Sequence, residues 1–225
     1  MLIEIPDILG SDQINRLRQY LLTAQYNDGR LSAGDLASGV KNNLELPADE
    51  KVVDLARIVY AGLVGNPTFN QFALPRRMTM PIFSRYDVGM EYGDHADVAL
   101  MGIDTPDMAT RTDLSLTLFL SDPETYDGGE LVVNTLVGQN RFKPAAGHVV
   151  VYPSHYLHHV TKVTRGVRLA AVAWVQSLIR EDDRRELLYE LNGVSETLAK
   201  QDIPRADADV LFNCYHKLMR MWADT

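Results

Sequence analysis

The chain has 225 residues, a hydrophobic share of 46%, one cysteine and a formal net charge of −8 at pH 7. A chain of this length can bury a sizeable core unaided, and a single cysteine excludes an intrachain disulfide. The negative net charge disfavours a nucleic-acid partner. The sequence has neither the basic start of a signal peptide nor an apolar run near the ~20 residues that a membrane span needs. We therefore expect a cytoplasmic protein without membrane contact.

The first 77 residues are expected to form one short strand and two helices around a polar stretch. The predicted elements, in chain order, are a strand over 2–5, a helix over 12–23, a polar glycine-containing stretch over 27–41 and a helix over 47–65. Ser11 can cap the first helix, whose apolar face is Ile14, Leu17, Leu21 and Leu22. Pro47 suits the first turn of the second helix, and Gly65 suits its end.

From Met78 the pattern becomes that of short β-strands. The β-prone segments are MTMPIFSRY, LSLTLFL, ELVVNTL, HVVVYP and GVRLAAVAWVQ, separated by Gly, Pro, Asp and Asn. No long helical pattern interrupts residues 78–177. About 100 residues of antiparallel strands suffice for a barrel or a jelly roll. DGGEL, at 127–131, reads as a turn with glycines at unusual dihedrals rather than as a pair of catalytic acids.

The last part of the chain is again helical. Its two apolar stripes are Leu187, Leu188, Leu191 and Leu198, then Val210, Leu211, Cys214, Leu218 and Trp222. We favour packing of these helices on the β core, with an isologous homodimer built through them as the alternative. The predicted fold class is therefore α+β, mainly β, divided into residues 1–77, 78–178 and 179–225.

The first candidate functional residues are His95 and Asp97, at the expected start of a strand. Successive strand side chains point to opposite faces, so these two share a face about 6.6 Å apart. One imidazole and one carboxylate make up two-thirds of the 2-His-1-carboxylate triad that binds non-haem Fe(II). Two polar residues on a solvated strand edge are the ordinary alternative.

The segment YPSHYLHHVTKVTRGVRLAAVAW supplies further candidates. It contains His155, His158 and His159, followed by Arg168 on an apolar strand. Burying an arginine there is costly without an anion, and its planar fork suits a carboxylate held by two bonds. Alternatively, Arg168 sits at the mouth of the barrel with its head in water, or pairs with an internal acid.

A hairpin is predicted between the last histidines and Arg168. TRG, at 164–166, reads as a three-residue loop with Gly166 in the left-handed conformation. Pairing across this loop sets His158 opposite Val172, on the same face as Arg168, and turns His159 away. A two-residue loop would reverse the assignment, so the choice of third ligand stays open on this argument.

Three blocks in this order and spacing, RYDVGMEYGDHAD, RTDLSLTLFLSDPETYDGGEL and YPSHYLHHVTKVTRGVR, resemble the PKHD-type hydroxylases. These form the PiuC-like branch of the prolyl/lysyl hydroxylase group of Fe(II)/2-oxoglutarate dioxygenases. The resemblance covers nearly the whole chain. It implies a double-stranded β-helix (jelly roll) flanked by N-terminal and C-terminal helices.

The resemblance also implies the site residues and cofactors. His95, Asp97 and His158 match the iron ligands, Arg168 matches the residue that binds the distal carboxylate of 2-oxoglutarate, and Tyr86 resembles a tyrosine bordering that cosubstrate. The histidine ten residues before the basic residue is His158, which favours it over His159. L-ascorbate is a further family expectation. The implied reaction is hydroxylation of a peptidyl prolyl or lysyl residue or of a small, iron-related molecule, with release of succinate and CO₂.

One departure and two rival functions accompany this reading. The family often has Asn-Ala after its first two ligands, where this chain has Val98 and Ala99, so a hydrogen bond beside the metal or a substrate contact is in doubt. A non-catalytic jelly-roll binding protein would lose one of the four key residues, and all four are present. A cupin-type metalloenzyme using the same ligands would not need Arg168.

Overall fold

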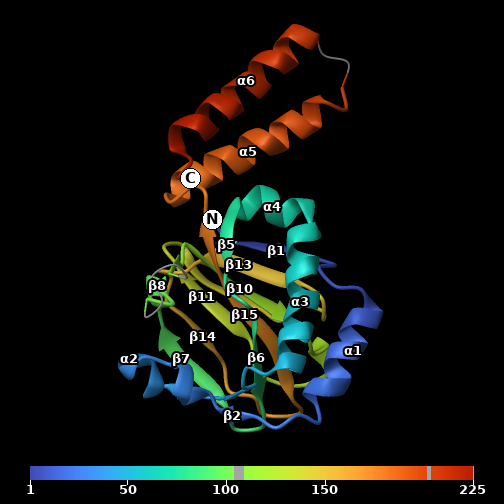
Figure 1. Cartoon of the computed structure of the whole chain (residues 1–225), viewed down its shortest axis with the longest axis vertical. Coiled ribbons are helices and arrows are strands. Elements are labelled where there is room, and N and C mark those ends of the chain that lie inside the picture. Colours follow the sequence, from blue (N-terminus) through green and yellow to red (C-terminus); the bar gives the residue numbers. More distant parts are fainter. Residues whose placement is uncertain (104–108, 202–203, 225) are drawn as a thin grey trace.

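The computed structural model describes residues 1–103, 109–201 and 204–224. The longer N-terminal helices cover one side of a β core, a short helix lies on the other side, and a helical hairpin projects from one end (Figure 1). The α-helices are α1 (Ser11–Leu21), α2 (Asp35–Ser38), α3 (Glu50–Gly65), α4 (Pro67–Ala73), α5 (Asp182–Leu198) and α6 (Arg205–Trp222). The short 3₁₀ turns are η1 (Gly29–Ser32) and η3 (Pro123–Thr125).

The strands are short, as the sequence predicted. They are β1 (Ile3–Ile5), β2 (Asn27–Asp28), β3 (Lys41–Asn42), β4 (Leu44–Glu45), β5 (Pro75–Met78), β6 (Ile82–Tyr86), β7 (Glu91–His95), β8 (Leu100–Met101), β9 (Thr110–Arg111), β10 (Leu114–Phe119), β11 (Leu131–Thr135), β12 (Gly138–Phe142), β13 (Val149–Pro153), β14 (His158–Val160) and β15 (Arg168–Ser177).

All of the strand pairs in the described part of the chain are antiparallel, in agreement with the predicted α+β class. The α-helices contain more residues than the strands, so the fold is mixed rather than mainly β. The larger sheet has eight strands in the order β1-β13-β10-β15-β6-β4-β2, with β5 also paired to β15. A second sheet has five strands in the order β12-β11-β14-β7-β3, and β8 pairs with β9. Both large sheets contribute residues to one cavity that lies between them.

The two faces of the larger sheet carry different side chains. Its strands β10 and β15 are almost entirely buried, so each face meets protein rather than water. Leu116 of β10 and Leu169 and Ala173 of β15 join the helix-covered core. Their neighbours in the chain, such as Ser115 and Arg168, turn to the cavity instead. Strand alternation thus separates core from cavity.

Local sequence explains the helices on the core face. In α1, the buried residues are Ile14, Leu17 and Leu21, whereas Leu22 is exposed; the N-cap is Gly10 rather than Ser11. Asp49 caps α3 through its side chain, so α3 begins after Pro47 rather than at it.

Helix α4 was not predicted. Asn66 accepts a hydrogen bond from the amide of Phe69, and Pro67 occupies the first turn. This Asn-Pro combination is a helix start, and its signal lay in the sequence.

The predicted hairpin between His158 and Arg168 is wrong. Strand β14 belongs to the five-stranded sheet and β15 to the eight-stranded sheet, so they do not pair. Residues 161–167 carry the chain from one sheet to the other. Gly166 does have a left-handed φ of 72°, as expected, but it serves this crossover, where a Cβ would meet the carbonyl oxygen of Thr125 at 2.1 Å. His158 lies opposite His95 and Val133, not Val172.

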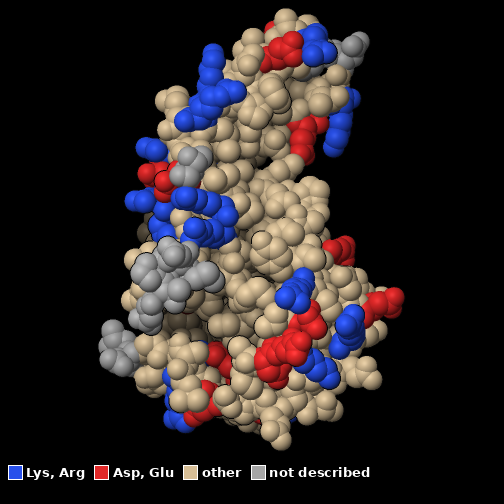
Figure 2. All heavy atoms as spheres, in the orientation of Figure 1, with Lys and Arg blue, Asp and Glu red and all other residues tan. Residues whose placement is uncertain are grey.

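The C-terminal helices pack chiefly on one another and on α4, away from the β core (Figure 1). The cluster at their base contains Leu74, Ile179 and Leu188, and α6 has no buried residue. We expected the apolar faces of both C-terminal helices to pack on the β core. Only the residues of this cluster at the base of the hairpin do so. Figure 2 shows uncharged surface between the charged groups of this hairpin. No helix in the described part of the chain is long and apolar enough to cross a membrane.

Leu188→Ala tests how firmly the hairpin is anchored. Leu188 is fully buried against Leu74 and Ile179, so its truncation should lower the free energy of unfolding by about 2–5 kcal/mol. The matched control is Val194→Ala on the same helix, where the side chain is exposed and the change should stay within about 0.5 kcal/mol. Urea unfolding measures both variants, and equal losses would contradict this anchoring.

Candidate active site

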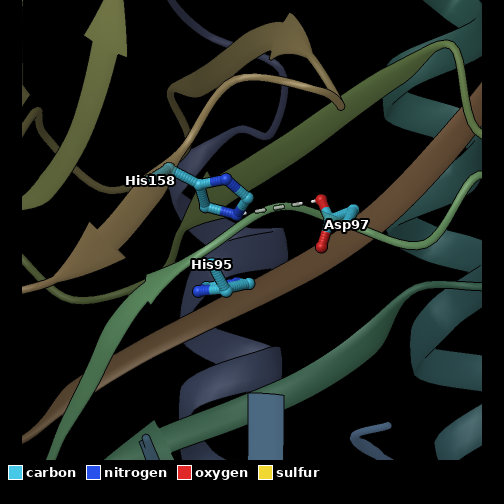
Figure 3. Close-up of side chains that lie close together, drawn as sticks. All are labelled: His95, Asp97 and His158. Carbon is cyan, nitrogen blue, oxygen red and sulfur yellow. Dashed lines mark ion pairs between the residues drawn. The ribbon is translucent and has the colours of Figure 1, made fainter. Parts of the chain in front are cut away.

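Three predicted ligands come together at one end of the cavity. His95 ends β7, Asp97 follows two residues later, and His158 begins β14. Their ligand atoms lie within 4.8 Å of one another, and Figure 3 shows the side chains directed toward a common point. The pairing of β7 with β14 sets the two histidines opposite each other. The strand predicted to start near His95 instead ends there, and Asp97 lies beyond it.

Each of the two histidines is oriented by a backbone carbonyl. Nδ1 of His95 lies 2.8 Å from the carbonyl oxygen of Gly93, and Nδ1 of His158 lies 2.9 Å from that of Tyr156. A carbonyl only accepts, so Nδ1 carries the proton in the neutral ring and Nε2 keeps its lone pair. This is the tautomer needed for metal binding through Nε2.

Asp97 is held by two serines. Its Oδ2 accepts a hydrogen bond from the Ser115 hydroxyl, which also lies 2.8 Å from the hydroxyl of Ser154. The amide of Asp97 donates to the carbonyl oxygen of Ser154. Oδ2 is 3.7 Å from Nε2 of His158, the contact marked in Figure 3. The carboxylate therefore has a defined orientation toward the histidines.

Burial keeps the first histidine neutral. Desolvation lowers the pKa of His95 to about 4, and the neighbouring His158 adds to that shift. The ring of His95 also stacks on Tyr92, with centroids 3.6 Å apart and planes 12° apart. A neutral imidazole is the form that donates a lone pair to a metal.

Arg168 is a buried cation with almost nothing around it to balance its charge. It is 1% exposed, and its guanidinium lies over the rings of Tyr86 and Phe119 at 5.0 and 5.2 Å. Its Nε and Nη2 have no hydrogen-bond partner, and none of the acids in the described part of the chain forms an ion pair with it. A Cβ at Gly129 would lie 3.0 Å from its Cδ, so the DGGEL turn makes room for this side chain.

The arginine and the triad open onto the same cavity. This cavity has a volume of ≈ 390 Å³ and is lined by both sheets. A buried guanidinium without an anion is costly, and its free N–H groups suit a carboxylate. The donor set, two neutral imidazoles and a carboxylate, fits Fe(II) with open coordination positions. The cavity therefore fits both a metal ion and an anion bound beside it.

Aromatic residues form much of the wall between these groups. Tyr86 lies opposite Arg168 in the sheet and lines the cavity, and burial raises its pKa to about 12 while the arginine works in the other direction. Tyr152 packs edge-on against His158 at 4.9 Å. Trp174 lies on the same face of β15 as Arg168, six residues further along, and also lines the cavity.

The other histidines of the same segment lie elsewhere. His159 turns away from His158, with its Nδ1 2.7 Å from Oδ1 of Asp94. His155 is exposed. Arg111 pairs with Asp113 at 2.7 Å, and Asp113 also accepts a hydrogen bond from the amide of Ser177 at the end of β15, so this pair ties β9 to β15. The glycines of DGGEL have φ values of 69° and 62°, as a turn requires.

Sequence reasoning missed part of the cavity wall. Lys41 and Glu45 line it as a buried ion pair, together with Ser32 and Asn43. The sequence places Ser32 and Lys41 in the polar stretch over 27–41 and predicts no element for Asn43 and Glu45. The residues between Lys41 and Glu45 are Asn-Asn-Leu, a run too short to show the period of a strand or a helix.

Two comparisons with protein families match most of the chain. Residues 81–176 match the 2OG-Fe(II) oxygenase superfamily, and residues 182–224 match the PKHD-type hydroxylase C-terminal domain. A PKHD-type hydroxylase of Cupriavidus metallidurans is 43% identical over 227 residues, covering 100% of both chains.

Solved structures share the fold. A prolyl hydroxylase from Trichoplax adhaerens, in complex with a hypoxia inducible factor peptide fragment, aligns with a TM-score of 0.54 at 14% identity, over 83% of this chain and 86% of that one. HygX from Streptomyces hygroscopicus, with nickel, 2-oxoglutarate and hygromycin B bound, aligns with a TM-score of 0.52 at 18% identity, over 80% and 84%.

The unpaired charge of Arg168 has a measurable effect on stability without any ligand. Arg168→Met removes an uncompensated buried cation, so the metal-free protein should unfold with an equal or higher free energy. Arg185 is the matched control, since it is equally buried but donates to the carbonyl oxygens of Ile179 and Arg180 and pairs with Asp182. Arg185→Met should cost about 1–3 kcal/mol. Urea unfolding compares them, and a larger loss for Arg168→Met would mean that its charge is balanced by the protein.

Proposed function

The chain belongs to the PKHD-type hydroxylase family of the 2OG-Fe(II) oxygenase superfamily, and on this basis we propose that His95, Asp97 and His158 hold its Fe(II) and that Arg168 anchors 2-oxoglutarate. The enzyme is a dioxygenase and an oxidoreductase. The observation that carries the residue assignment is the placement of a buried, unpaired guanidinium in the same cavity as the triad.

Fe(II), with O₂ and 2-oxoglutarate, supplies oxidising power that hydroxylates a C–H bond of the substrate while 2-oxoglutarate becomes succinate and CO₂. The protein contributes the orientation of the proposed metal ligands. The carbonyls of Gly93 and Tyr156 fix the tautomers of the two histidines, and Ser115 orients the carboxylate of Asp97. No side chain of the cavity is required as an acid or a base.

Arg168 and Tyr86 position the cosubstrate in this proposal. The free N–H groups of Arg168 match a terminal carboxylate of 2-oxoglutarate, held by two charge-assisted bonds. The Tyr86 ring lies beneath the guanidinium and keeps it from turning out of the cavity. Burial keeps the Tyr86 phenol protonated, because its pKa is about 12, so it can donate a hydrogen bond to the same dianion.

The fold and its division fit this activity. We propose that the two sheets around the cavity form a double-stranded β-helix, with the catalytic core at 78–178, the N-terminal elements at 1–77 packed on it, and the helical extension at 179–225. The family matches at 81–176 and 182–224 support these boundaries. The exposed apolar residues Val210, Phe212 and Met221 on α6 support a homodimer through this extension.

The substrate is a peptide or a small molecule in this proposal. A neighbouring fold binds a peptide fragment and another binds hygromycin B, so the fold accommodates both. We further propose cytoplasmic action, supported by the single free cysteine, and expect L-ascorbate to sustain turnover as in the family. Val98, where relatives often carry Asn, lines the cavity mouth as an exposed apolar side chain.

The ligand assignment is tested by paired histidine variants. His158→Ala should lose Fe(II), because two protein ligands rarely hold Fe(II) against water, and Asp97→Ala should do the same. His159→Ala is the matched control and should keep metal and cosubstrate, since His159 pairs with Asp94 instead. Binding by all three variants is measured by anaerobic Fe(II) titration in the presence of 2-oxoglutarate, through the weak charge-transfer band that appears when 2-oxoglutarate chelates the iron. A kept band in His158→Ala with a lost band in His159→Ala would reverse the assignment.

Arg168 is tested separately from the metal. Arg168→Ala should keep Fe(II) binding but weaken 2-oxoglutarate by ~100-fold or more, since a bidentate charge-assisted pair is lost. Arg168→Lys should recover only part of the affinity, because an ammonium lacks the planar fork. Calorimetric titration of the anaerobic metal-loaded variants measures this. Undiminished binding of 2-oxoglutarate to Arg168→Ala would require another cation as anchor.

A further inference from the structure

A buried ion pair lies in the cavity wall and has no part in the proposed metal and cosubstrate binding. Nζ of Lys41 lies 2.5 Å from Oε1 of Glu45 and 2.8 Å from Oγ of Ser32, and both charged side chains are about nine-tenths buried. Ser32 in turn donates to Oε2 of Glu45 at 2.6 Å. All three residues line the cavity.

The pair spans the two sheets in the wall of the cavity. Lys41 is in β3, which pairs with β7 of the five-stranded sheet, opposite Tyr92. Glu45 is in β4, which pairs with β6 of the eight-stranded sheet, opposite Ser84. The chain crosses between the sheets within residues 41–45, and the ion pair closes that crossover. Nζ of Lys41 also lies 5.2 Å from the ring of Tyr92, which stacks on His95.

Stability alone does not account for a buried pair at this place. Removing two charges from water costs several kcal/mol per ion, and apolar residues of similar volume often serve a fold as well or better. The two charges cancel within the wall, so this part of the cavity presents hydrogen-bonding atoms without net charge. A role in selecting what enters the cavity explains both the burial and the pairing.

The charges of the rest of the cavity also cancel once its proposed ligands are present. Its other charged groups in the described part of the chain are Asp97 and Arg168, with neutral histidines as metal ligands. The Fe(II) dication and the guanidinium then balance the carboxylate of Asp97 and the two carboxylates of 2-oxoglutarate. No charge is left over for a charged substrate group to neutralise.

The remaining wall is apolar or carries neutral polar groups. Its apolar side chains include Ala33, Ala37, Ile82, Val98, Leu100 and Met101. Two buried polar atoms of the lining have no partner, namely Oγ of Ser84 and Nε1 of Trp174. A hydroxyl, which can accept as well as donate, and an N–H donor together suit an uncharged amide, which offers both a carbonyl and N–H groups.

We propose that the Lys41–Glu45 pair is a specificity-determining element that restricts the substrate to an uncharged, mainly apolar moiety carrying amide-type hydrogen-bonding groups. This inference rests on the proposed function of the same cavity. A free ammonium, as in a lysyl side chain, or a carboxylate entering here is rejected because it would be desolvated without a counter-charge. Glu45 is already neutralised by Lys41, and Lys41 by Glu45.

Single substitutions at this pair should change the preferred charge in opposite directions. Glu45→Gln keeps the shape of the wall and leaves Lys41 as an unpaired cation, so an anionic moiety becomes favourable. Lys41→Met leaves Glu45 as an unpaired anion and favours a cationic moiety. The double variant, Lys41→Met with Glu45→Gln, is neutral again and should return to the preference of the wild type.

Three blocked amino acids with unbranched side chains serve as probes. They are N-acetyl-norleucinamide, N-acetyl-lysinamide and the N-acetyl amide of glutamate with a free side-chain carboxylate. The protein is loaded with Mn(II) and 2-oxoglutarate, and the paramagnetic relaxation of probe side-chain protons is measured by NMR. The Zn(II)-loaded protein gives the diamagnetic blank. Relaxation of the 2-oxoglutarate methylene protons, in the same samples, reports separately on metal and cosubstrate binding.

In the wild type and the double variant, the norleucine probe should be enhanced about tenfold or more over both charged probes. Glu45→Gln should favour the glutamate probe and Lys41→Met the lysine probe. Equal enhancement of all three probes in the wild type, or enhancement of none, overturns the proposal, as does a double variant that keeps the preference of either single variant. Unrelaxed 2-oxoglutarate would instead contradict the proposed function. If one single variant fails to fold, the other still decides, because a probe preference unchanged from that of the wild type overturns the proposal.

Discussion

Strands that are buried on both faces impose the main constraint on this protein. In β10 and β15, alternate side chains face the helix-covered core, and the side chains between them face the cavity. The core side is filled by leucine, alanine and valine, which need no partners. The cavity side carries Ser115 and Arg168, whose polar groups must find partners within the protein or in a ligand. The site is thus built on the polar, cavity-facing side of the sheet, whereas the apolar, core-facing side stabilises the fold.

Some polar groups on the cavity side have hydrogen-bond partners within the protein, and others have none. The proposed metal ligands are oriented by neighbours: two backbone carbonyls for the histidines and Ser115 for the carboxylate of Asp97. Arg168 is left with free N–H groups. This difference follows from chemistry, because a ligand to a metal must be held in one orientation, whereas an anchor must keep its hydrogen bonds for the molecule that it binds. Lys41 and Glu45 form a third case, satisfied by each other and therefore without net charge toward the cavity.

The connection between the two sheets explains why residues distant in the chain meet. The crossover at 161–167 takes the chain from the strand that carries His158 to the strand that carries Arg168, and a second crossover, within 41–45, also connects the two sheets. Gly166 and the two glycines of DGGEL adopt left-handed conformations beside the first crossover, where a Cβ would collide with backbone or with Arg168. These glycines are structural, and they give the arginine its room.

The sequence by itself determined that the middle of the chain forms short antiparallel strands and that helices flank them. It also identified the residues of the triad and Arg168 as candidates. His95 and Asp97 are neighbours in sequence, and Arg168 stands out against an apolar strand, so local pattern and family spacing were enough to find them. Only the tertiary structure decided the strand partners. A hairpin and a crossover can share the same turn residues, and a short loop does not reveal which sheet the next strand joins. The predicted pairing of β14 with β15 was therefore wrong, although His158, and not His159, does lie beside His95 and Asp97. The Lys41–Glu45 pair was equally invisible, because a two-residue strand has no period to detect and its burial depends on two sheets that form some 40 or more residues further along the chain.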